Sequence, residues 1–244
     1  MTDLTSFVPL LAEAVCRHKT LPPLPPGLTE MEGYQLARQL AQAVVGEKAL
    51  HALKAGLTDP RIQAHLGLYE VMLGHLYPNR RLQSGARLSR RGKAMIECEL
   101  AVFVDAGGRP VSVAPALEFV NVDFARSEDL TPPNLAAINL GADAFLVGET
   151  QPWNDATLAS LDTIRIELYR DEALLLEAPA NSSLGGAVDG SQWMLDKARQ
   201  LGWSLDGETL LMTGTVGKPL AFVPGVYRAD YGPLGSLSFT IDDQ

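Results

Sequence analysis

The sequence predicts an α+β fold that is mainly β and carries its helices near the N-terminus. Apolar residues recur at helical spacing in two segments before residue 46, whereas turn signals and β-type runs alternate along most of the chain beyond residue 93. One helical pattern, at residues 191–201, interrupts the strands. Segregated helices and strands are typical of α+β folds, and 244 residues are enough to bury a sizeable core.

The N-terminal segment is expected to be helical. Residues 4–18 carry one apolar stripe, and the proline-rich stretch 21–27 that follows is expected to run extended. Thr29 and Glu32 form a capping-box pattern, which predicts the start of a second helix that runs to about Val45. These helices would cap the remainder of the chain.

Residues 1–51 are therefore assigned to a helical cap and residues 52–244 to a β-rich unit, the two forming one continuous body. A turn-rich segment at 54–60 opens this unit, and Asp59 before Pro60 predicts a short helix through residue 66. Strands are expected at residues 94–104, 111–122, 144–147, 163–170, 172–178, 209–214, 226–231 and 235–241.

The composition argues against several classes of function. A formal net charge of −9 and a pI of about 4.9 disfavour binding to nucleic acid or to anionic membrane surfaces. No apolar stretch is long enough to span a bilayer, and the N-terminus lacks the basic and apolar regions of a signal peptide. Cys16 and Cys98 have no spacing typical of a disulfide framework. We therefore expect a protein of the reducing cytoplasm.

Two carboxylates interrupt the most apolar of the predicted strands. Glu97 and Glu99 are two residues apart, so their side chains lie on the same face of that strand. Glu118 stands in a similar apolar run. Paired anions in such surroundings predict a cation between them, and oxygen ligands without His or Cys favour Mg²⁺ or Mn²⁺. The alternative is a solvated outer face of an edge strand, where acidic residues are common.

Four short motifs then occur in the order and approximate spacing seen in the fumarylacetoacetate hydrolase superfamily. They are KAGLT from Lys54, IECELA from Ile96, ALEFV from Ala116 and MTGT from Met212. Within that superfamily the chain most resembles the branch of 2-keto-4-pentenoate hydratase and 4-oxalocrotonate decarboxylase. The resemblance extends from Lys54 to the C-terminus. It implies a distorted mixed β-roll as the catalytic domain, with an N-terminal helical cap.

The resemblance also implies roles for individual residues. Glu97, Glu99 and Glu118 match the family carboxylates that hold Mg²⁺ or Mn²⁺, and Lys54 matches the family lysine beside the substrate. Three carboxylates, one lysine and one divalent ion leave the site near neutral. A 2-oxo acid could then chelate the metal through its carboxylate and oxo oxygens. Without the resemblance, Lys54 would be interpreted as a surface lysine at a turn.

A glycine-containing loop provides further candidates for substrate binding. Thr213, Gly214 and Thr215 could offer backbone N–H groups to the far end of the substrate, and Lys218 could offer its ammonium group. The loop is not a Walker loop, because the glycine spacing and the residue after the lysine are wrong. The alternative is a plain β-turn that has no functional role.

The chain departs from the family pattern at two positions. Met72 stands where hydratase-type relatives carry an aspartate, so Glu70 or His75 are candidates for a displaced catalytic acid or base. A lone histidine in an apolar segment is more often structural, which is the alternative for His75. In the polar run further along, Asn139 is retained as a substrate-binding candidate, but Gly141 stands where a hydroxyl residue is expected.

Three functions follow from these observations. The first is a metal-dependent hydratase of the 2-keto-4-pentenoate type, which acts on a 2-oxo or 2-hydroxydienoate acid in aromatic-compound degradation. The second is a decarboxylase of the 4-oxalocrotonate type, which needs neither the missing acid nor the missing hydroxyl group. The third is a catalytically silent relative that binds a metal or an oxo acid. The resemblance also implies a homo-oligomer.

Overall fold

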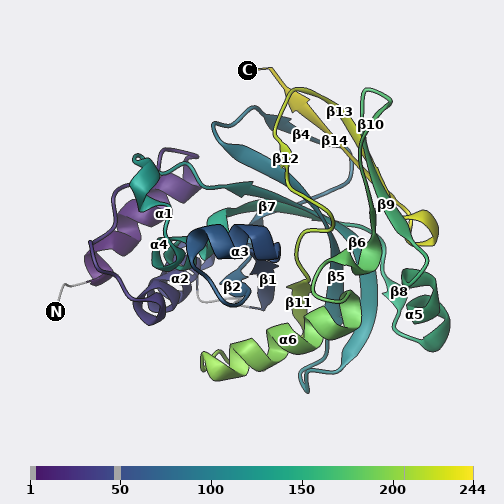
Figure 1. Ribbon diagram of the computed structural model, residues 1–244, viewed down its shortest axis with the longest axis horizontal. Coiled ribbons are helices and arrows are strands. Elements are labelled where there is room, and N and C mark those ends of the chain that lie inside the picture. Colours follow the sequence, from purple (N-terminus) through teal and green to yellow (C-terminus); the bar gives the residue numbers. More distant parts are fainter. Residues whose placement is uncertain (1–3, 47–50, 206, 244) are drawn as a thin grey trace.

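The computed structural model describes residues 4–46, 51–205 and 207–243 and contains two mixed β-sheets and a set of helices (Figure 1). Helices hold 33% and strands 34% of the chain, so the predicted α+β class is confirmed. The helices are α1 (Val8–Cys16), α2 (Glu30–Val45), α3 (Pro60–Leu66), α4 (Pro132–Ala137), α5 (Asp155–Leu161) and α6 (Ala187–Gln200).

The larger sheet has nine strands in the order β2-β1-β11-β5-β6-β7-β3, with β12 paired to β5 and β8 paired to β6. The smaller sheet has five strands in the order β10-β9-β13-β14-β4. The bounds in the larger sheet are β1 (Ala52–Gly56), β2 (Met72–His75), β3 (Arg81–Leu82), β5 (Ala94–Val104), β6 (Pro110–Asn121), β7 (Ala142–Val147), β8 (Gln151–Pro152), β11 (Thr209–Met212) and β12 (Leu220–Ala221). The bounds in the smaller sheet are β4 (Ala86–Ser89), β9 (Arg165–Arg170), β10 (Ala173–Pro179), β13 (Gly225–Asp230) and β14 (Ser236–Asp242).

The N-terminal helices pack together on one side of the larger sheet, where Figure 1 shows α1, α2 and α4 side by side. The predicted capping box is present, because the Thr29 hydroxyl accepts from the Glu32 N–H and the Glu32 carboxylate accepts from the Thr29 N–H. Gly33 allows α2 to approach α4 closely, since a Cβ there would lie 2.4 Å from the Pro133 carbonyl oxygen. The first helix and α3 are also confirmed, with α3 ending at Leu66 as predicted.

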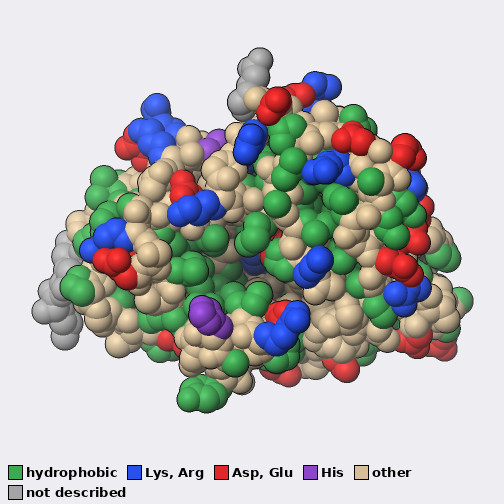
Figure 2. Space-filling model, turned by 45° about the horizontal axis from the view of Figure 1, so that its top comes forward, with side chains coloured by type: hydrophobic (Ala, Val, Ile, Leu, Met, Phe, Trp, Pro, Cys, Tyr) green, Lys and Arg blue, Asp and Glu red, His purple; other side chains and the backbone are tan. Residues whose placement is uncertain are grey.

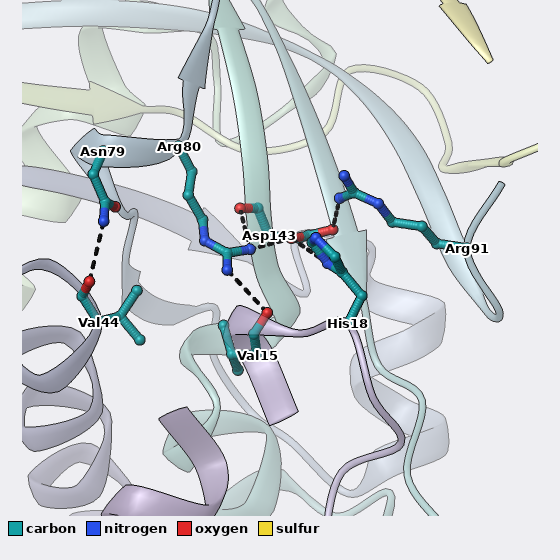
Figure 3. A network of polar contacts seen from close by, with 7 residues as sticks. All are labelled: Val15, His18, Val44, Asn79, Arg80, Arg91 and Asp143. Atoms are coloured by element: carbon teal, nitrogen blue, oxygen red, sulfur yellow. Dashed lines mark hydrogen bonds and ion pairs between the residues drawn. The ribbon is translucent and has the colours of Figure 1, made fainter. Parts of the chain in front are cut away.

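A polar network ties the first helix to the larger sheet (Figure 3). Asp143 on β7 is buried and pairs with the Arg80 guanidinium at 2.6 Å, with Arg91, and with the His18 ring at 3.2 Å. Arg80 also donates to the Val15 carbonyl at 3.0 Å, at the end of α1. Burial acts to raise the pKa of Asp143, but His18 and the two arginines lower it below its usual value. The carboxylate therefore stays ionised and holds the helix end on the sheet.

Several elements differ from the sequence prediction. Residues 54–56 belong to β1 rather than to a turn, because this short segment is paired between β2 and β11 and is buried. Residues 72–75, for which no strand was expected, form strand β2. Helix α6 begins four residues before its expected start, directly after Gly186. Within the described residues, no helix is long and apolar enough to cross a membrane.

Candidate metal centre and active site

Two neighbouring central strands position the three predicted carboxylates. The register of β5 and β6 places Glu97 opposite Glu118, and Glu99 follows Glu97 on the same face. β5 lies between β11 and β6 in the sheet, so the alternative of an edge strand with a solvated face is wrong. Carboxylate oxygens of all three residues lie within 4.8 Å of one another. We call these three residues the carboxylate cluster.

The carboxylate cluster is removed from solvent. Glu99 and Glu118 are fully buried, and Glu97 is 8% exposed. The backbone N–H of Gly214 donates to Glu99 Oε2 at 2.9 Å. In contrast, Glu99 Oε1 and Glu118 Oε2 are buried without a hydrogen-bond partner among the residues that the structure describes. Unpartnered buried carboxylate oxygens are costly, so this geometry calls for a cation.

Lys54 provides one positive charge at the carboxylate cluster. It pairs in register with Met212 on β11, which pairs with Ala101 on β5, so the lysine projects from the same face as the carboxylates. Its Nζ lies 2.6 Å from Glu118 Oε1 and 3.5 Å from the carbonyl oxygen of Leu140. The side chain is 2% exposed. The alternative of a surface lysine is therefore wrong.

The buried charges perturb one another strongly. Burial raises the pKa of Glu99 well above its usual value, and the charges of Glu118 and Glu97 raise it further. Burial also raises the pKa of Glu118 to about 7, although Lys54 opposes that shift. Burial acts to lower the pKa of Lys54, but the three glutamates outweigh it and raise that pKa. One lysine cannot compensate three carboxylates, so the cluster holds protons unless another cation is present.

A divalent ion fits this set of donors. Three ionised carboxylates and Lys54 carry a formal charge of −2, which one divalent ion would neutralise. The cluster offers only oxygen ligands, as Mg²⁺ and Mn²⁺ prefer. The two unpartnered oxygens, Glu99 Oε1 and Glu118 Oε2, are available as ligand atoms. The residues present therefore match the chemistry of a hard divalent cation.

A cavity of about 410 Å³ opens over one end of the carboxylate cluster and is lined by both Lys54 and Glu97. Its walls are mostly apolar, and Figure 2 shows hydrophobic side chains gathered around a hollow on one face of the molecule. Helix α3 and the segment before it form one wall, and strands β5 and β6 form the floor. The apolar lining residues include Leu57, Ile62, Leu66, Met95, Val120, Val122, Leu130, Leu135 and Leu140. The cavity is large enough for a small organic acid.

The structure does not bring His75 to the carboxylate cluster. His75 pairs in register with Leu53, so its side chain lies on the sheet face opposite that of Lys54. Its ring is 1% exposed and stacks on Trp203, with 4.1 Å between the ring centroids. Burial, with a smaller effect of Arg38, lowers its pKa to about 3. The prediction that His75 is a catalytic acid or base is corrected to a packing role.

Glu70 also lies outside the cavity wall. It follows α3, its side chain is 54% exposed, and it pairs with Lys197 on α6 at 2.6 Å. This ion pair fastens the segment after α3 to α6. Met72, at the position of the expected acid, is fully buried on β2. Neither residue presents an acid to the cavity.

Asn139 has a structural role instead of the predicted contact with substrate. Its Oδ1 accepts from the His75 N–H at 2.8 Å, and its Nδ2 donates to the Ala37 carbonyl at 2.9 Å and to the Tyr77 hydroxyl at 3.3 Å. The amide is thus fully used in joining α2 to β2. The lost hydroxyl at residue 141 also has a steric reason. Gly141 has φ of +75°, and a Cβ there would lie 2.7 Å from a Val122 methyl carbon.

The predicted residues of the glycine-containing loop differ in their contacts, because some make internal hydrogen bonds and one lines the cavity. The Thr213 hydroxyl donates to the Leu100 carbonyl at 3.2 Å, and the Gly214 N–H donates to the Glu99 carboxylate. Thr215 lines the cavity, whereas Lys218 is exposed and outside its wall. Leu140 and the cavity residues of α3 were not predicted from the sequence. The sequence could have indicated the α3 residues, because α3 directly follows the motif that contains Lys54.

Comparison with known proteins agrees with this architecture. No protein-family model matches the chain. The fold is that of the fumarylacetoacetate hydrolase superfamily, as the sequence resemblance predicted. Among the solved structures, 4-oxalocrotonate decarboxylase from Pseudomonas putida G7 superposes with a TM-score of 0.85 at 17% identity, covering 98% of this chain and 97% of that chain.

That decarboxylase structure is a complex with magnesium and adipate. A second similar structure is fumarylpyruvate hydrolase from Pseudomonas aeruginosa in complex with Mn²⁺ and pyruvate. It gives a TM-score of 0.59 at 15% identity and covers 79% of this chain and 89% of that chain. These two neighbours are thus enzymes solved with divalent metals and small organic acids. The decarboxylase matches almost the whole chain, including the N-terminal helices.

Proposed function

We propose that this protein is a metal-dependent lyase that acts on a 2-oxo acid, with decarboxylation as its reaction. The observation that carries the proposal is the carboxylate cluster beside Lys54 at the end of an apolar cavity. A near full-length likeness in fold to a 4-oxalocrotonate decarboxylase supports it.

Glu97, Glu99 and Glu118 would hold Mg²⁺ or Mn²⁺ in this proposal. A divalent ion bound there supplies a Lewis acid for the oxo group of the substrate and stabilises the negative charge that develops on it. Lys54 keeps its proton because the carboxylates raise its pKa. Its ammonium therefore holds Glu118 in place and adds positive charge next to the substrate carboxylate.

The apolar walls favour loss of carbon dioxide. A carboxylate in such surroundings is poorly solvated and therefore destabilised. The neutral CO₂ that it becomes needs little solvation, so its formation is favoured there. Leu57, Leu135 and Leu140, from different segments of the chain, are among the apolar residues that line the cavity. Decarboxylation also needs no group that activates water. Glu70 and His75, the residues predicted as acid or base, lie outside the cavity, so they are not available for that task.

Hydration of a 2-hydroxydienoate, as in 2-keto-4-pentenoate hydratase, is the second candidate. It uses the same metal and 2-oxo acid chemistry, but it also requires delivery of water to a distant carbon. Met72 is buried where the expected acid would stand. A silent relative that binds only the metal and an oxo acid is the third candidate.

The three candidates differ in their products. The metal-loaded protein would be incubated with 4-oxalocrotonate and, separately, with 2-hydroxypenta-2,4-dienoate, and CO₂ and the hydrated acid would be measured. Release of CO₂ from the first acid supports decarboxylation, and water addition to the second supports hydration. Binding of Mn²⁺ and oxalate without either product supports the silent relative.

The proposal extends to the localisation and the oligomeric state of the protein. We infer a cytoplasmic protein with small-molecule substrates that assembles into a homo-oligomer, as the sequence resemblance implies. Light scattering at several protein concentrations measures the oligomeric state directly.

A further inference from the structure

Helix α3 contributes polar side chains to the cavity that the proposed function has not used. None of its residues is buried, although Pro60, Arg61, Ile62, His65 and Leu66 all line the cavity. The helix therefore forms a wall that faces both the cavity and solvent. Its polar members lie on a different element from the carboxylate cluster, which comes from β5 and β6.

The charged or titratable groups that line the cavity are few in the described part of the chain. They are Lys54, Asp59, Arg61, His65 and Glu97. Lys54 pairs with Glu118, and Glu97 belongs to the carboxylate cluster.

Asp59 and Arg61 neutralise each other in a two-pronged pair. Arg61 Nε donates to Asp59 Oδ1 at 3.1 Å and its Nη2 donates to Oδ2 at 2.7 Å. Asp59 also caps the start of α3 by accepting from the Arg61 N–H at 2.8 Å. A guanidinium does not release a proton at neutral pH, so Arg61 cannot serve as an acid. His65 is left as the cavity group that makes no hydrogen bond or ion pair within the described residues.

We propose that His65 is the catalytic acid of this site and gives a proton to the substrate carbon that loses CO₂. This inference rests on the proposed decarboxylase function. Imidazole is the side chain that exchanges protons most readily near neutral pH. Lys54 is less suited to the task because its ammonium is paired with Glu118, whose Oε1 lies 2.6 Å from Nζ.

The step balances with groups that the molecule and water provide. The bond between the distal carbon and its carboxylate breaks, CO₂ leaves, and the electron pair moves along the conjugated chain to the oxo oxygen. The imidazolium of His65 then gives its proton to the distal carbon, and the electron pair returns from oxygen to form that C–H bond. Because His65 is exposed, the neutral ring regains its proton from water.

The test compares His65→Gln and His65→Ala with the wild type in steady-state turnover of 4-oxalocrotonate with Mn²⁺. We expect both variants to lose about 100-fold in kcat, with unchanged Mn²⁺ and oxalate affinities. Added imidazole should restore turnover to His65→Ala, which a merely structural role would not produce.

His18→Gln is the matched control, because it makes the same change outside the cavity, and it should retain wild-type kcat. Wild-type kcat in His65→Gln would overturn the inference and leave the proposed function intact. A wild-type protein that releases no CO₂ would overturn the proposed function and this inference with it.

Discussion

The ammonium of Lys54 lies 2.6 Å from the carboxylate of Glu118, and both side chains are buried. The two residues are 64 positions apart in the sequence, and they meet because β1 and β6 contribute to one face of the larger sheet. Two further glutamates lie beside this pair, so the charge is not balanced.

Removal of one carboxylate should stabilise the metal-free protein and abolish tight metal binding. Glu99→Gln keeps the shape of the side chain but removes a buried charge that repels Glu97 and Glu118. We expect the free energy of unfolding to rise by about 1 kcal/mol and Mn²⁺ affinity to fall at least about 100-fold. Urea unfolding and calorimetric titration measure the two quantities. The exposed Glu149→Gln is the control and should change neither.

Metal affinity should rise with pH across neutrality. The pKa of Glu118 is raised from 4.5 to about 7, so a proton must leave when a metal ion binds near neutral pH. Calorimetry in buffers with different heats of ionisation should show proton release, and affinity should fall as the pH drops from about 8 to about 6. A constant affinity over this range would contradict the assigned charge state.

The same pKa shift governs the stability of the metal-free protein. The folded state holds the Glu118 proton more tightly than the unfolded chain does, so this group's contribution to stability is lost as the pH rises from about 4.5 through about 7. Bound Mn²⁺ should therefore raise the melting temperature more at alkaline pH than at acidic pH. Thermal unfolding with and without Mn²⁺ at both pH values tests this difference.

Lys54→Met should destabilise the protein in a way that depends on pH. At about pH 8 the variant leaves a buried Glu118 carboxylate without its counter-ion, which costs about 3 kcal/mol or more. Below neutral pH Glu118 is protonated, so the loss should shrink. The double variant Lys54→Met/Glu118→Gln should recover most of the stability. An equal loss at both pH values would show that packing, not charge, dominates at this site.

His75→Phe should retain activity. The ring of His75 stacks on Trp203, both of its nitrogens lack hydrogen-bond partners in the described residues, and its low pKa keeps it neutral. A phenyl ring preserves the stacking and removes two unpartnered polar atoms, so stability should be unchanged or higher. Turnover and thermal unfolding check both expectations. A loss of kcat beyond about tenfold would contradict the packing role and indicate that His75 takes part in catalysis.

The sequence allowed the carboxylate cluster and its strand to be predicted because the pattern is local. Residues 94–104 are β-type throughout, and strand alternation alone places Glu97 and Glu99 on one face. That Glu118 stands opposite Glu97 depends on the register between two strands, which the superfamily resemblance supplied indirectly.

The role of His75 could not be predicted in the same way. Residues 72–75 contain a glycine and no β-branched side chain, so they gave no strand signal, and the face occupied by His75 was unknown. β2 forms because its residues pair with β1 and are buried there. Asn139 likewise matched the family pattern, but its amide is consumed by contacts with residues far away in the sequence.

The most direct test of the account is the titration of metal-free protein with Mn²⁺, with and without oxalate, beside Glu97→Ala. Glu97 lines the cavity and belongs to the carboxylate cluster, so it connects the proposed ion to the proposed substrate. We expect one tight Mn²⁺ site per chain, whose affinity oxalate raises and which Glu97→Ala lacks. Equal Mn²⁺ binding by wild type and variant, or no binding at all, would contradict it.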